Sequence, residues 1–261
     1  MIAPLYGAQV RERFSRSAAH YDHHARLQRS LAWRLARLCR DLPLGEGPAA
    51  DLGAGSGLLS RALVRQLPPL QQHPPLQLDL CPELLAHNPL LSQEGQGAAP
   101  AKSLIWDLNN GLPPGLDGCS LLVSGFALQW LDDPARQLRH WGHRLAPGGW
   151  LALTVPTRGS FPQWHQAAFE ADVPFTALDL PAATSLITAA ETNLTLHTCQ
   201  LLRFSRPAQG GLVALRHLQQ LGATASRGPR LSTPQMRRLL NRWSRSSPLT
   251  WEILLLLAHR P

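Results

Sequence analysis

Three glycines and an aspartate lie close together at the junction between a short apolar segment and a helical pattern. The junction reads Asp51-Leu52-Gly53-Ala54-Gly55-Ser56-Gly57, and the helical pattern spans residues 58–67. Glycine allows a tight turn and a close approach of a ligand to the backbone, and a helix N-terminus offers free N–H groups. A dinucleotide-binding GxGxxG loop would need glycine at position 58, where Leu58 stands instead. The pattern therefore predicts a ligand-binding loop that need not hold a pyrophosphate.

The carboxylate of Asp51 fits a different ligand. It would repel a phosphate, but it can order the loop and can bind an ammonium group, directly or through water. The spacing DxGxGxG resembles the loop that binds S-adenosyl-L-methionine in class I methyltransferases. This resemblance implies S-adenosyl-L-methionine as the cofactor, with contacts from Asp51, Gly53, Ala54, Gly55 and Gly57. An ordinary glycine-rich turn is the alternative.

Two further acidic residues end the next two apolar segments along the chain. Asp79 follows Gly57 by 22 residues, and Asp107 ends the apolar segment that begins at Ser103. Because the carboxyl ends of parallel strands meet at one edge of a sheet, both carboxylates would face the glycine loop across one crevice. Either aspartate alone could be a loop cap, whereas together we expect Asp79 to accept from the ribose hydroxyls and Asp107 from the adenine amino group. The neighbours expected to line this crevice are Leu80, Leu108 and Ser124.

The elements that would position these residues follow from the hydrophobic pattern. Short apolar segments alternate with amphipathic ones, which is typical of an α/β fold with a mostly parallel sheet covered by helices on both faces. Strands are predicted at residues 49–52, 76–80, 103–107, 120–124, 150–155, 194–204 and 249–259. Helices are predicted at residues 24–40, 58–67, 134–145, 208–221 and 234–243, with a turn at Pro147-Gly148-Gly149.

Charge is distributed unevenly along the 261 residues. The 25 Lys and Arg outnumber the 17 Asp and Glu, and the net charge of +8 divides into +6 over residues 1–40, −7 over 41–202 and +9 over 203–261. Two basic ends around an acidic middle predict a surface that attracts an anionic partner, either nucleic acid, an acidic protein or a polar lipid surface. Nucleic acid is disfavoured because no basic stretch is interleaved with the aromatic residues that would stack on bases.

The sequence also argues against a membrane-spanning or secreted protein. No apolar run approaches the ~20 residues that a membrane-spanning helix needs. The chain opens without the basic start of a secretory signal, and none is predicted. The cysteines are isolated, so that neither a disulfide framework nor a zinc cage is expected, and a cytoplasmic location is predicted. They are Cys39, Cys81, Cys119 and Cys199.

Motifs outside the glycine loop resemble those of one methyltransferase family. The stretch Phe14-Ser15-Arg16-Ser17-Ala18-Ala19-His20-Tyr21-Asp22, continuing to Leu27-Gln28, resembles the N-terminal signature of the malonyl-acyl-carrier-protein O-methyltransferases of biotin synthesis. The resemblance extends from about residue 13 to residue 260. Its further matches are Ala127–Trp130, Arg158–Ser160, Leu215–Thr224 and Pro248–Thr250.

This resemblance implies an architecture. It implies a seven-stranded sheet whose last strand runs antiparallel, an N-terminal helical lid over residues 1–44 and a class I methyltransferase domain over residues 45–261. Within that domain, residues 156–193 and 205–247 would form a helical cap over the substrate. Tyr21 and Gln28 would belong to the lid and close on the cofactor and its reacting methyl group. A Tyr21 ring packed in the core, with its hydroxyl in water, is the alternative.

The resemblance also implies a reaction, namely methyl transfer to the free carboxylate of malonyl-acyl carrier protein, which gives the methyl ester that primes pimeloyl synthesis for biotin. A malonyl carboxylate is ionised at neutral pH, so that no general base is required, and alignment and exclusion of water can supply the catalysis. A cation is needed to orient the carboxylate. Arg158 and Arg216 are the candidates, with a role as ordinary surface residues as the alternative. Gln129 and Trp130 are expected beside the substrate.

The basic ends would then dock the acidic carrier protein and its phosphate-bearing arm by electrostatic attraction. The candidate arginines are Arg26, Arg29, Arg37, Arg237, Arg238 and Arg242. No metal site is expected, because His20 and His24 have an i, i+4 spacing but no further ligand stands nearby. Two other functions stay open, namely another small-molecule methyltransferase, acting on quinone precursors or free carboxylic acids, and a non-catalytic module that binds S-adenosyl-L-methionine.

Overall fold

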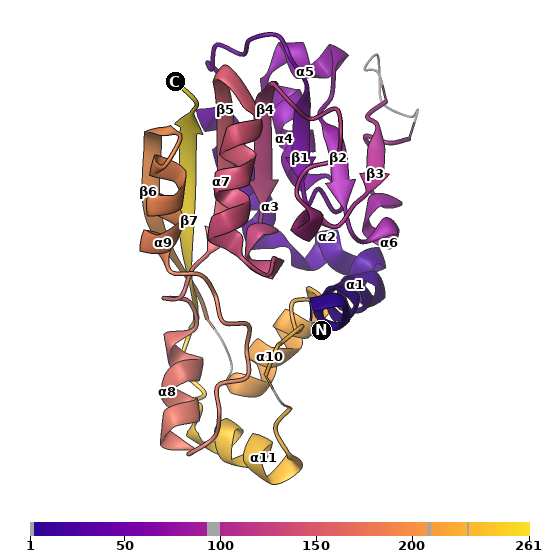
Figure 1. The fold of residues 1–261 in the computed structure, drawn as a ribbon. Helices are drawn as coiled ribbons and strands as arrows, with labels where there is room; N and C mark the ends of the chain where they lie inside the picture. Colours follow the sequence, from indigo (N-terminus) through magenta and orange to yellow (C-terminus); the bar gives the residue numbers. More distant parts are fainter. Residues whose placement is uncertain (1–2, 93–99, 208–209, 229) are drawn as a thin grey trace.

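The fold is built around one mixed β-sheet (Figure 1). The strands of the computed structural model, which describes residues 3–92, 100–207, 210–228 and 230–261, are β1 (Ala49–Leu52), β2 (Leu76–Asp79), β3 (Ser103–Ile105), β4 (Cys119–Gly125), β5 (Leu145–Pro156), β6 (Thr195–Arg206) and β7 (Leu249–His259). They pair in the order β3-β2-β1-β4-β5-β7-β6. The pairs among β1 to β5 are parallel, and β7 runs antiparallel to both β5 and β6. The predicted strands and the antiparallel last strand are confirmed.

Helices cover both faces of the sheet (Figure 1). α7 (Pro134–Arg144) and α9 (Ala183–Glu191) lie on one face, and α3 (Arg26–Leu38) and α4 (Leu58–Gln66) lie on the other. This layering confirms the predicted α/β class. The shorter elements are α5 (Pro68–Gln72), α6 (Pro82–Leu85) and the 3-10 turns η1 (Ala18–His20), η2 (Leu108–Asn110) and η3 (Leu128–Trp130).

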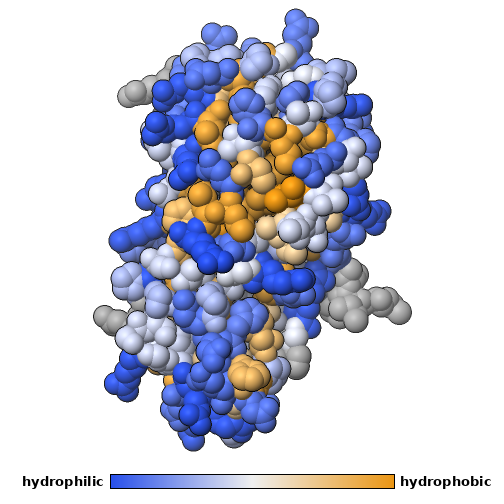
Figure 2. All heavy atoms as spheres, turned by 90° about the vertical axis from the view of Figure 1, so that its left-hand side faces the viewer, coloured by the Kyte–Doolittle hydropathy of each residue, from blue (hydrophilic) through white to orange (hydrophobic). Residues whose placement is uncertain are grey.

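β6 forms one edge of the sheet. Its residues alternate between exposed and partly buried, and Cys199 and Leu201 are among the exposed ones. Figure 2 shows that apolar surface gathers on this side of the molecule at the level of the sheet, above a more hydrophilic lower half. The alternation is typical of a strand that packs on the core by one face only.

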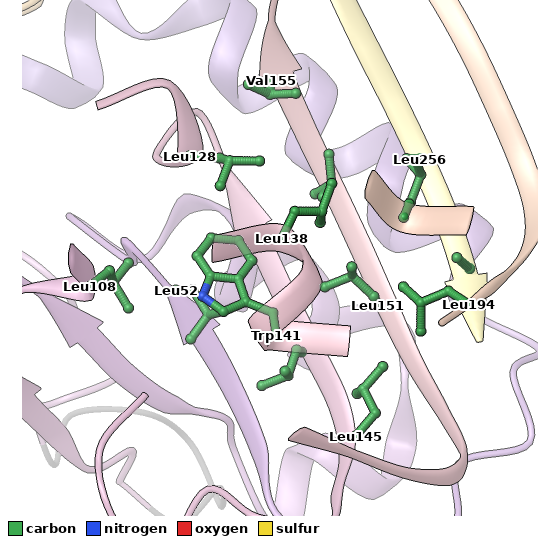
Figure 3. Packing of buried hydrophobic residues seen from close by; sticks show 14 of the residues in the cluster. Leu52, Leu108, Leu128, Leu138, Trp141, Leu145, Leu151, Val155, Leu194 and Leu256 are labelled. Atoms are coloured by element: carbon green, nitrogen blue, oxygen red, sulfur yellow. The ribbon is translucent and has the colours of Figure 1, made fainter. Parts of the chain in front are cut away.

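Buried aliphatic side chains fill both sides of the sheet. Along β7, Leu254 and Leu256 pack into the face covered by α7 and α9, while Leu255 and Leu257 pack into the opposite face. A strand covered on both faces is apolar at every position, which explains the continuous apolar run of this strand. Figure 3 shows the first of these clusters, in which the fully buried Trp141 of α7 lies among leucines from the sheet.

Two helical regions stand at the carboxyl ends of the parallel strands (Figure 1). The N-terminal arm consists of α1 (Ala3–Ser17), η1 and α2 (Tyr21–His24). The cap consists of α8 (Pro162–Glu170), α10 (Gly211–Gln220), α11 (Thr233–Arg242) and the segments that connect them to the sheet. Trp164, Trp243 and Trp251 lie in the core of the cap, so that aromatic packing holds these helices together.

Several boundaries differ from the predicted ones for local reasons. The helix predicted from His24 starts at Arg26, because Ala25 (φ −80°, ψ 44°) interrupts the helical geometry. Pro147-Gly148-Gly149, predicted as a turn, belongs to β5, because Gly148 N–H donates to Arg260 O and Arg260 N–H donates to Gly149 O. Residues 208 and 209 of the helix predicted at 208–221 lie outside the described residues, and α10 itself starts at Gly211.

The predicted lid segment and the first predicted cap segment each contain helices that pack in two different places. Within the lid predicted at residues 1–44, the arm stands over the strand ends, whereas α3 packs against α4 and the sheet. Within the cap segment predicted at 156–193, α8 belongs to the cap, whereas α9 packs against α7 on the sheet. The segment 205–247 supplies α10 and α11. In the described part of the chain, no helix is both long and apolar enough to cross a membrane.

Candidate functional site

A cleft lies at the carboxyl ends of β1, β2 and β4. The glycine loop, defined as Gly53–Gly57, borders it together with Asp51, Asp79 and Asp107. From the arm, the cleft is closed by Gly7, Val10 and Phe14. Its cavity measures about 120 Å³, below the roughly 300–1,000 Å³ of typical ligand pockets, because α1 lies over it. A nucleoside-sized ligand would therefore have to move the arm outward.

The glycine loop has a conformation that glycine adopts at low cost. Gly53 (φ +81°) and Gly57 (φ +77°) are left-handed. A Cβ atom on Gly53 would overlap the Cβ of Ala127, and one on Gly57 would overlap the side-chain amide of Asn88. The N–H groups of Gly53 and Ala54 both donate to the carbonyl of Leu78, at 2.9 Å each, which ties the loop to β2.

Asp79 fixes the glycine loop to the end of β2. One carboxylate oxygen accepts from the Gly55 N–H (2.7 Å) and the other from the Cys81 N–H (2.8 Å). Burial raises the pKa of Asp79 to about 6, although these backbone hydrogen bonds lower it. The carboxylate also lines the cleft. Asp79 therefore acts as a loop cap and still has acceptor capacity for a ligand.

Asp51 is a buried carboxylate with one free oxygen. Its side chain accepts from Ser60 Oγ (2.7 Å), which in turn accepts from Gln77 Nε2 (2.9 Å). Among the described residues, its Oδ1 has no partner, although the residue lines the cleft. Burial raises the pKa of Asp51 to about 7. A free, buried carboxylate oxygen beside a cleft fits a cationic group of a ligand, such as an ammonium.

Other residues predicted for the cofactor divide into two groups. Asp107 lines the cleft together with Leu80 and Leu108, and one of its oxygens caps η2 by accepting from the Asn109 N–H (2.9 Å). Gly57 and Ser124 are not among the residues that line the cleft. The hydroxyl of Ser124, which is fully buried, donates to Leu52 O (2.8 Å) and so ties β4 to β1.

A second cavity, of about 570 Å³, lies between the arm and the cap. Most of its lining is apolar or aromatic, including Phe161, Trp164 and Trp251. The residues that line both the cleft and this cavity are Phe14, Tyr21, Gln28, Phe126 and Trp130. The two spaces are therefore neighbours, and a group bound in one can meet a group bound in the other at this shared wall.

The shared wall contains three residues predicted from the family resemblance. Tyr21 packs against the cluster formed by Ala18, Cys81 and Leu84, and burial, followed by Asp79 and Asp22, raises its pKa. Its ring is thus part of a core cluster and also lines both spaces. The side-chain oxygen of Gln28 and the indole N–H of Trp130 are buried without a partner among the described residues. These groups are free to bind a ligand.

The two arginines predicted to hold a carboxylate lie in different places. Arg216 of α10 lines the second cavity. Arg158 is exposed in the turn before α8, its N–H donates to Pro181 O, and it lines neither space. The structure therefore brings only Arg216 to the predicted site. Gln129 also lines the second cavity, where its Nε2 donates to Phe126 O (2.6 Å) and its Oε1 has no partner among the described residues.

Phe126 and Arg13 belong to these walls although no pattern in the sequence marks them as site residues. Phe126 has a left-handed backbone (φ +58°), which is costly for a residue with a side chain and is typical of functional sites. Arg13 lines the second cavity and its Nε is buried without a partner among the described residues. No spacing rule marks either residue. Phe126 does stand directly after the strand predicted near Ser124, where site residues of such sheets are found.

The arm is held over the cleft by polar contacts. Asp22 accepts from Ser56 Oγ of the glycine loop (2.5 Å) and pairs with Arg61 (2.6 Å). At the other end of the arm, the guanidinium of Arg227 lies 3.8 Å from the ring centroid of Tyr6 and pairs with Asp132 (2.7 Å). Opening the cleft would break these contacts.

His20 and His24 do not share a helix, because η1 ends at His20 and α2 starts at Tyr21. Within the described residues, no group of three or more His, Cys, Asp and Glu is placed to hold a metal ion.

Comparisons with known proteins place these features in context. No family model matches the sequence. The chain is 32% identical to the biotin biosynthesis bifunctional protein BioCD of Bordetella avium, over 90% of the chain and 49% of that relative. It is 26% identical to the malonyl-[acyl-carrier protein] O-methyltransferase of Marinomonas sp., over 98% of the chain and 95% of the relative. The chain spans about half the length of the Bordetella protein and of a 36% identical relative from Alcanivorax borkumensis.

Solved structures share the fold at low sequence identity. The YcgJ protein of Bacillus subtilis superimposes with a TM-score of 0.59 at 13% identity, over 89% of this chain and 99% of the other. The geranyl diphosphate C-methyltransferase of Streptomyces coelicolor, solved with S-adenosyl-L-homocysteine, gives a TM-score of 0.52 at 14% identity, over 87% and 77%. By sequence this chain is similar to malonyl-[acyl-carrier protein] O-methyltransferases. By structure it has the class I methyltransferase fold.

Proposed function

We propose that this chain transfers a methyl group from S-adenosyl-L-methionine to the free carboxylate of malonyl-acyl carrier protein. The observation that carries the proposal is the lining of the second cavity. Among its described residues it includes Arg13, Arg216 and Arg230 but no His, Asp, Glu, Lys or Cys. Such a cavity suits an acceptor that is anionic before it binds and needs no base. A phenolic acceptor, such as a quinone precursor, would need a group to take its proton.

The cleft suits the cofactor. We assign the free oxygen of Asp51 to the ammonium of S-adenosyl-L-methionine, Asp79 to the ribose hydroxyls and Asp107 to the adenine amino group. When bound, the cofactor supplies an electrophilic methyl group on a sulfonium. Gly53, Ala54 and Gly55 present backbone at the cleft without bulky side chains, and Leu80 and Leu108 give it apolar walls.

The shared wall aligns the two reactants. Tyr21, Gln28 and Trp130 line both spaces, so that they would surround the carboxylate and the methyl group and would help to exclude water from them. Arg216 would bind the carboxylate through charge-assisted hydrogen bonds. Catalysis then comes from alignment and from a water-poor environment around opposite charges.

The partner would be an acidic carrier protein. Arg26, Arg29 and Arg37 are exposed on α3, and Arg237, Arg238 and Arg242 are exposed on α11. The net charge of +9 over residues 203–261 supports long-range attraction of an acidic protein to the cap. We place the reaction in the cytoplasm, in keeping with the four free cysteines of the chain.

The test is a methyl-transfer assay with purified protein and S-adenosyl-L-methionine. We expect methyl ester on malonyl-acyl carrier protein, detected by mass spectrometry of the intact carrier, and far slower transfer to free malonate. Transfer to a phenolic quinone precursor and to neither carboxylate would contradict the proposal. Cofactor binding without transfer to any acceptor would point to a non-catalytic module. Rescue of a biotin auxotroph that lacks this activity gives an independent genetic readout.

A further inference from the structure

A third hollow lies between the arm and the end of α10. We call it the basic hollow; its cavity measures about 370 Å³ and every residue that lines it is polar. Its lining consists of Arg13, Arg16, Ser17, His20 and His24 from the arm and Gln219, Gln220 and Thr224 from the cap. Arg13, Gln219 and Thr224 also line the second cavity. The basic hollow therefore adjoins the space proposed for the malonyl group.

The arm and the cap are in close contact beside the basic hollow. Gly222, which follows α10, has a left-handed backbone (φ +72°). A Cβ atom there would lie 2.5 Å from Ser17 Oγ and 3.0 Å from Arg13 O. Glycine thus lets the cap touch the end of α1, and this contact holds residues from the arm and the cap around one space.

Positive charge in the basic hollow lacks an acidic counterpart among the described residues that line it. Arg16 pairs with Glu12, which stands on the exposed side of α1. Arg13 has no ion-pair partner within the described part of the chain, and its Nε is buried without an acceptor. Arginine in this state is suited to an anion that comes from outside the chain.

Positive charge also contributes, after burial, to the pKa shifts of two neighbouring histidines. Burial, followed by the charges of His23 and His20 and then of Arg206 and Arg26, holds the pKa of His24 below its usual range. His217 contacts Arg206 (2.9 Å), and burial, followed by Arg206 and His24, lowers the pKa of His217 to about 4. No acidic group contributes to either shift. A bound anion would relieve this repulsion and raise the pKa of His24.

We propose that the basic hollow binds the phosphate group of a phosphopantetheine arm, carried by an acyl carrier protein or contained in coenzyme A. The proposal rests on the proposed function, because a malonyl thioester in the second cavity has its pantetheine arm leading out of that cavity. The apolar cavity suits the acyl and alkyl part, and the polar hollow beside it suits the phosphate. Arg13 and His24 would supply charge, and the hydroxyls of Ser17 and Thr224 would supply neutral hydrogen bonds.

Direct binding tests the basic hollow without any turnover. Isothermal titration compares 4′-phosphopantetheine with pantetheine, which lacks the phosphate, at constant ionic strength. We expect the phosphorylated compound to bind roughly ten-fold tighter or more, the ratio expected for charge-assisted hydrogen bonds. The double variant Arg13→Gln, His24→Gln should abolish this ratio, and Arg11→Gln, on the same helix but near Glu83 instead, should keep it. Equal affinity of the two compounds for the unaltered protein would overturn the proposal.

Kinetics with three substrates then identify the source of the phosphate. In the variant Arg16→Gln, His24→Gln, whose two residues line the basic hollow but not the second cavity, KM for malonyl-acyl carrier protein and for malonyl-coenzyme A should rise roughly ten-fold with little change in kcat. KM for malonyl-pantetheine should stay the same. A rise confined to malonyl-coenzyme A would overturn the assignment, because it would place the nucleotide phosphates of coenzyme A in the hollow. An equal rise for all three substrates would also contradict it, since it would show a general effect on the second cavity.

The two proposals fail in different ways. If no malonyl thioester is methylated, the proposed function is wrong, whatever the titration shows. If malonyl thioesters are methylated and the phosphate makes no difference to binding, the basic hollow is not the phosphate site. The variant Arg16→Gln, His24→Gln also replaces the Arg13 variant in the titration if the latter does not fold, because Arg16 is exposed and His24 is only partly buried.

Discussion

The cofactor cleft and the second cavity adjoin each other, yet they are built in different ways. The floor of the cleft is the glycine loop with Asp51, Asp79 and Asp107 at the ends of neighbouring strands, and hydrogen bonds such as that from the Gly55 N–H to Asp79 fix it. The second cavity consists mostly of aromatic and aliphatic side chains, largely from the arm and the cap, with three arginines among its polar groups. The cleft is therefore set by the sheet, whereas the cavity is set by how helices distant in the sequence pack together.

This difference has a consequence for the effect of substitutions. A backbone site tolerates almost no added atoms, because the sheet and the loop cannot move apart without breaking hydrogen bonds. A side-chain cavity can repack, and its polar residues can be replaced one at a time. We therefore expect the largest effects from small changes in the glycine loop and graded effects from charge changes in the arm and the cap.

The largest expected effect comes from Gly53→Ala. The new Cβ would overlap Ala127, and a left-handed backbone is costly for alanine. We expect affinity for S-adenosyl-L-methionine to fall by roughly 100-fold, from about 1–3 kcal/mol of backbone strain together with the clash. The measurement is isothermal titration, with the melting temperature followed in parallel. Gly45→Ala is the matched control, because a Cβ there meets nothing within 4 Å. Unchanged cofactor affinity in Gly53→Ala would place the cofactor elsewhere.

The second prediction compares Arg216 with Arg158, the two arginines that the sequence analysis names as candidates to orient the carboxylate. Arg216→Gln should lower kcat/KM for malonyl-acyl carrier protein by roughly 10- to 150-fold, the range for hydrogen bonds to charged groups. Affinity for S-adenosyl-L-methionine should not change, because Arg216 does not line the cleft. Arg158→Gln should leave both quantities near those of the unaltered protein, since Arg158 is exposed outside both spaces. The reverse pattern would show that the carboxylate lies near the turn before α8.

The cleft could be predicted from the sequence in more detail than the second cavity. Asp51, Asp79 and Asp107 could be placed because strand ends in a parallel sheet meet at one edge, and local patterns locate those ends. Strands such as β4 and β7 could be predicted because a continuous apolar run marks a strand covered on both faces, and β6 because its residues alternate.

The cap could not be predicted in the same detail. Arg158 and Arg216 are the same residue type, and each stands in a motif that resembles the family, so that the packing of α10 against the arm is what separates them. Arg13 joins the site through its contact with a glycine more than 200 positions away, Gly222, which no local pattern reveals. Ser124 shows the converse case, because its position at a strand end predicts a ligand contact, whereas in the structure its hydroxyl donates to Leu52 O within the sheet and the residue does not line the cleft.

The third prediction concerns the pH dependence of the cleft. The pKa of Asp51 is about 7, raised by burial, so that the carboxyl of the free protein is largely protonated below neutral pH. Binding of an ammonium requires the ionised form. Cofactor affinity should therefore rise as pH increases from about 5.5 to about 7, by up to roughly ten-fold per pH unit, and then level off. Asp51→Asn should bind more weakly and keep only the rise below about pH 6 that Asp79, with its pKa raised to about 6, contributes. A flat profile in the unaltered protein would remove Asp51 from the ammonium site.

The smallest expected effect concerns docking at the cap. Replacing Arg237, Arg238 and Arg242 by glutamate should raise KM for malonyl-acyl carrier protein a few-fold at low salt and leave KM for malonyl-pantetheine unchanged. The difference should shrink as salt rises, because the screening length falls to about 8 Å at 0.15 M ionic strength. The matched control replaces Arg65, Arg136 and Arg139, which lie on the helices that cover the sheet. If both triple variants raise KM equally, attraction depends on net charge alone and the cap holds no docking surface of its own.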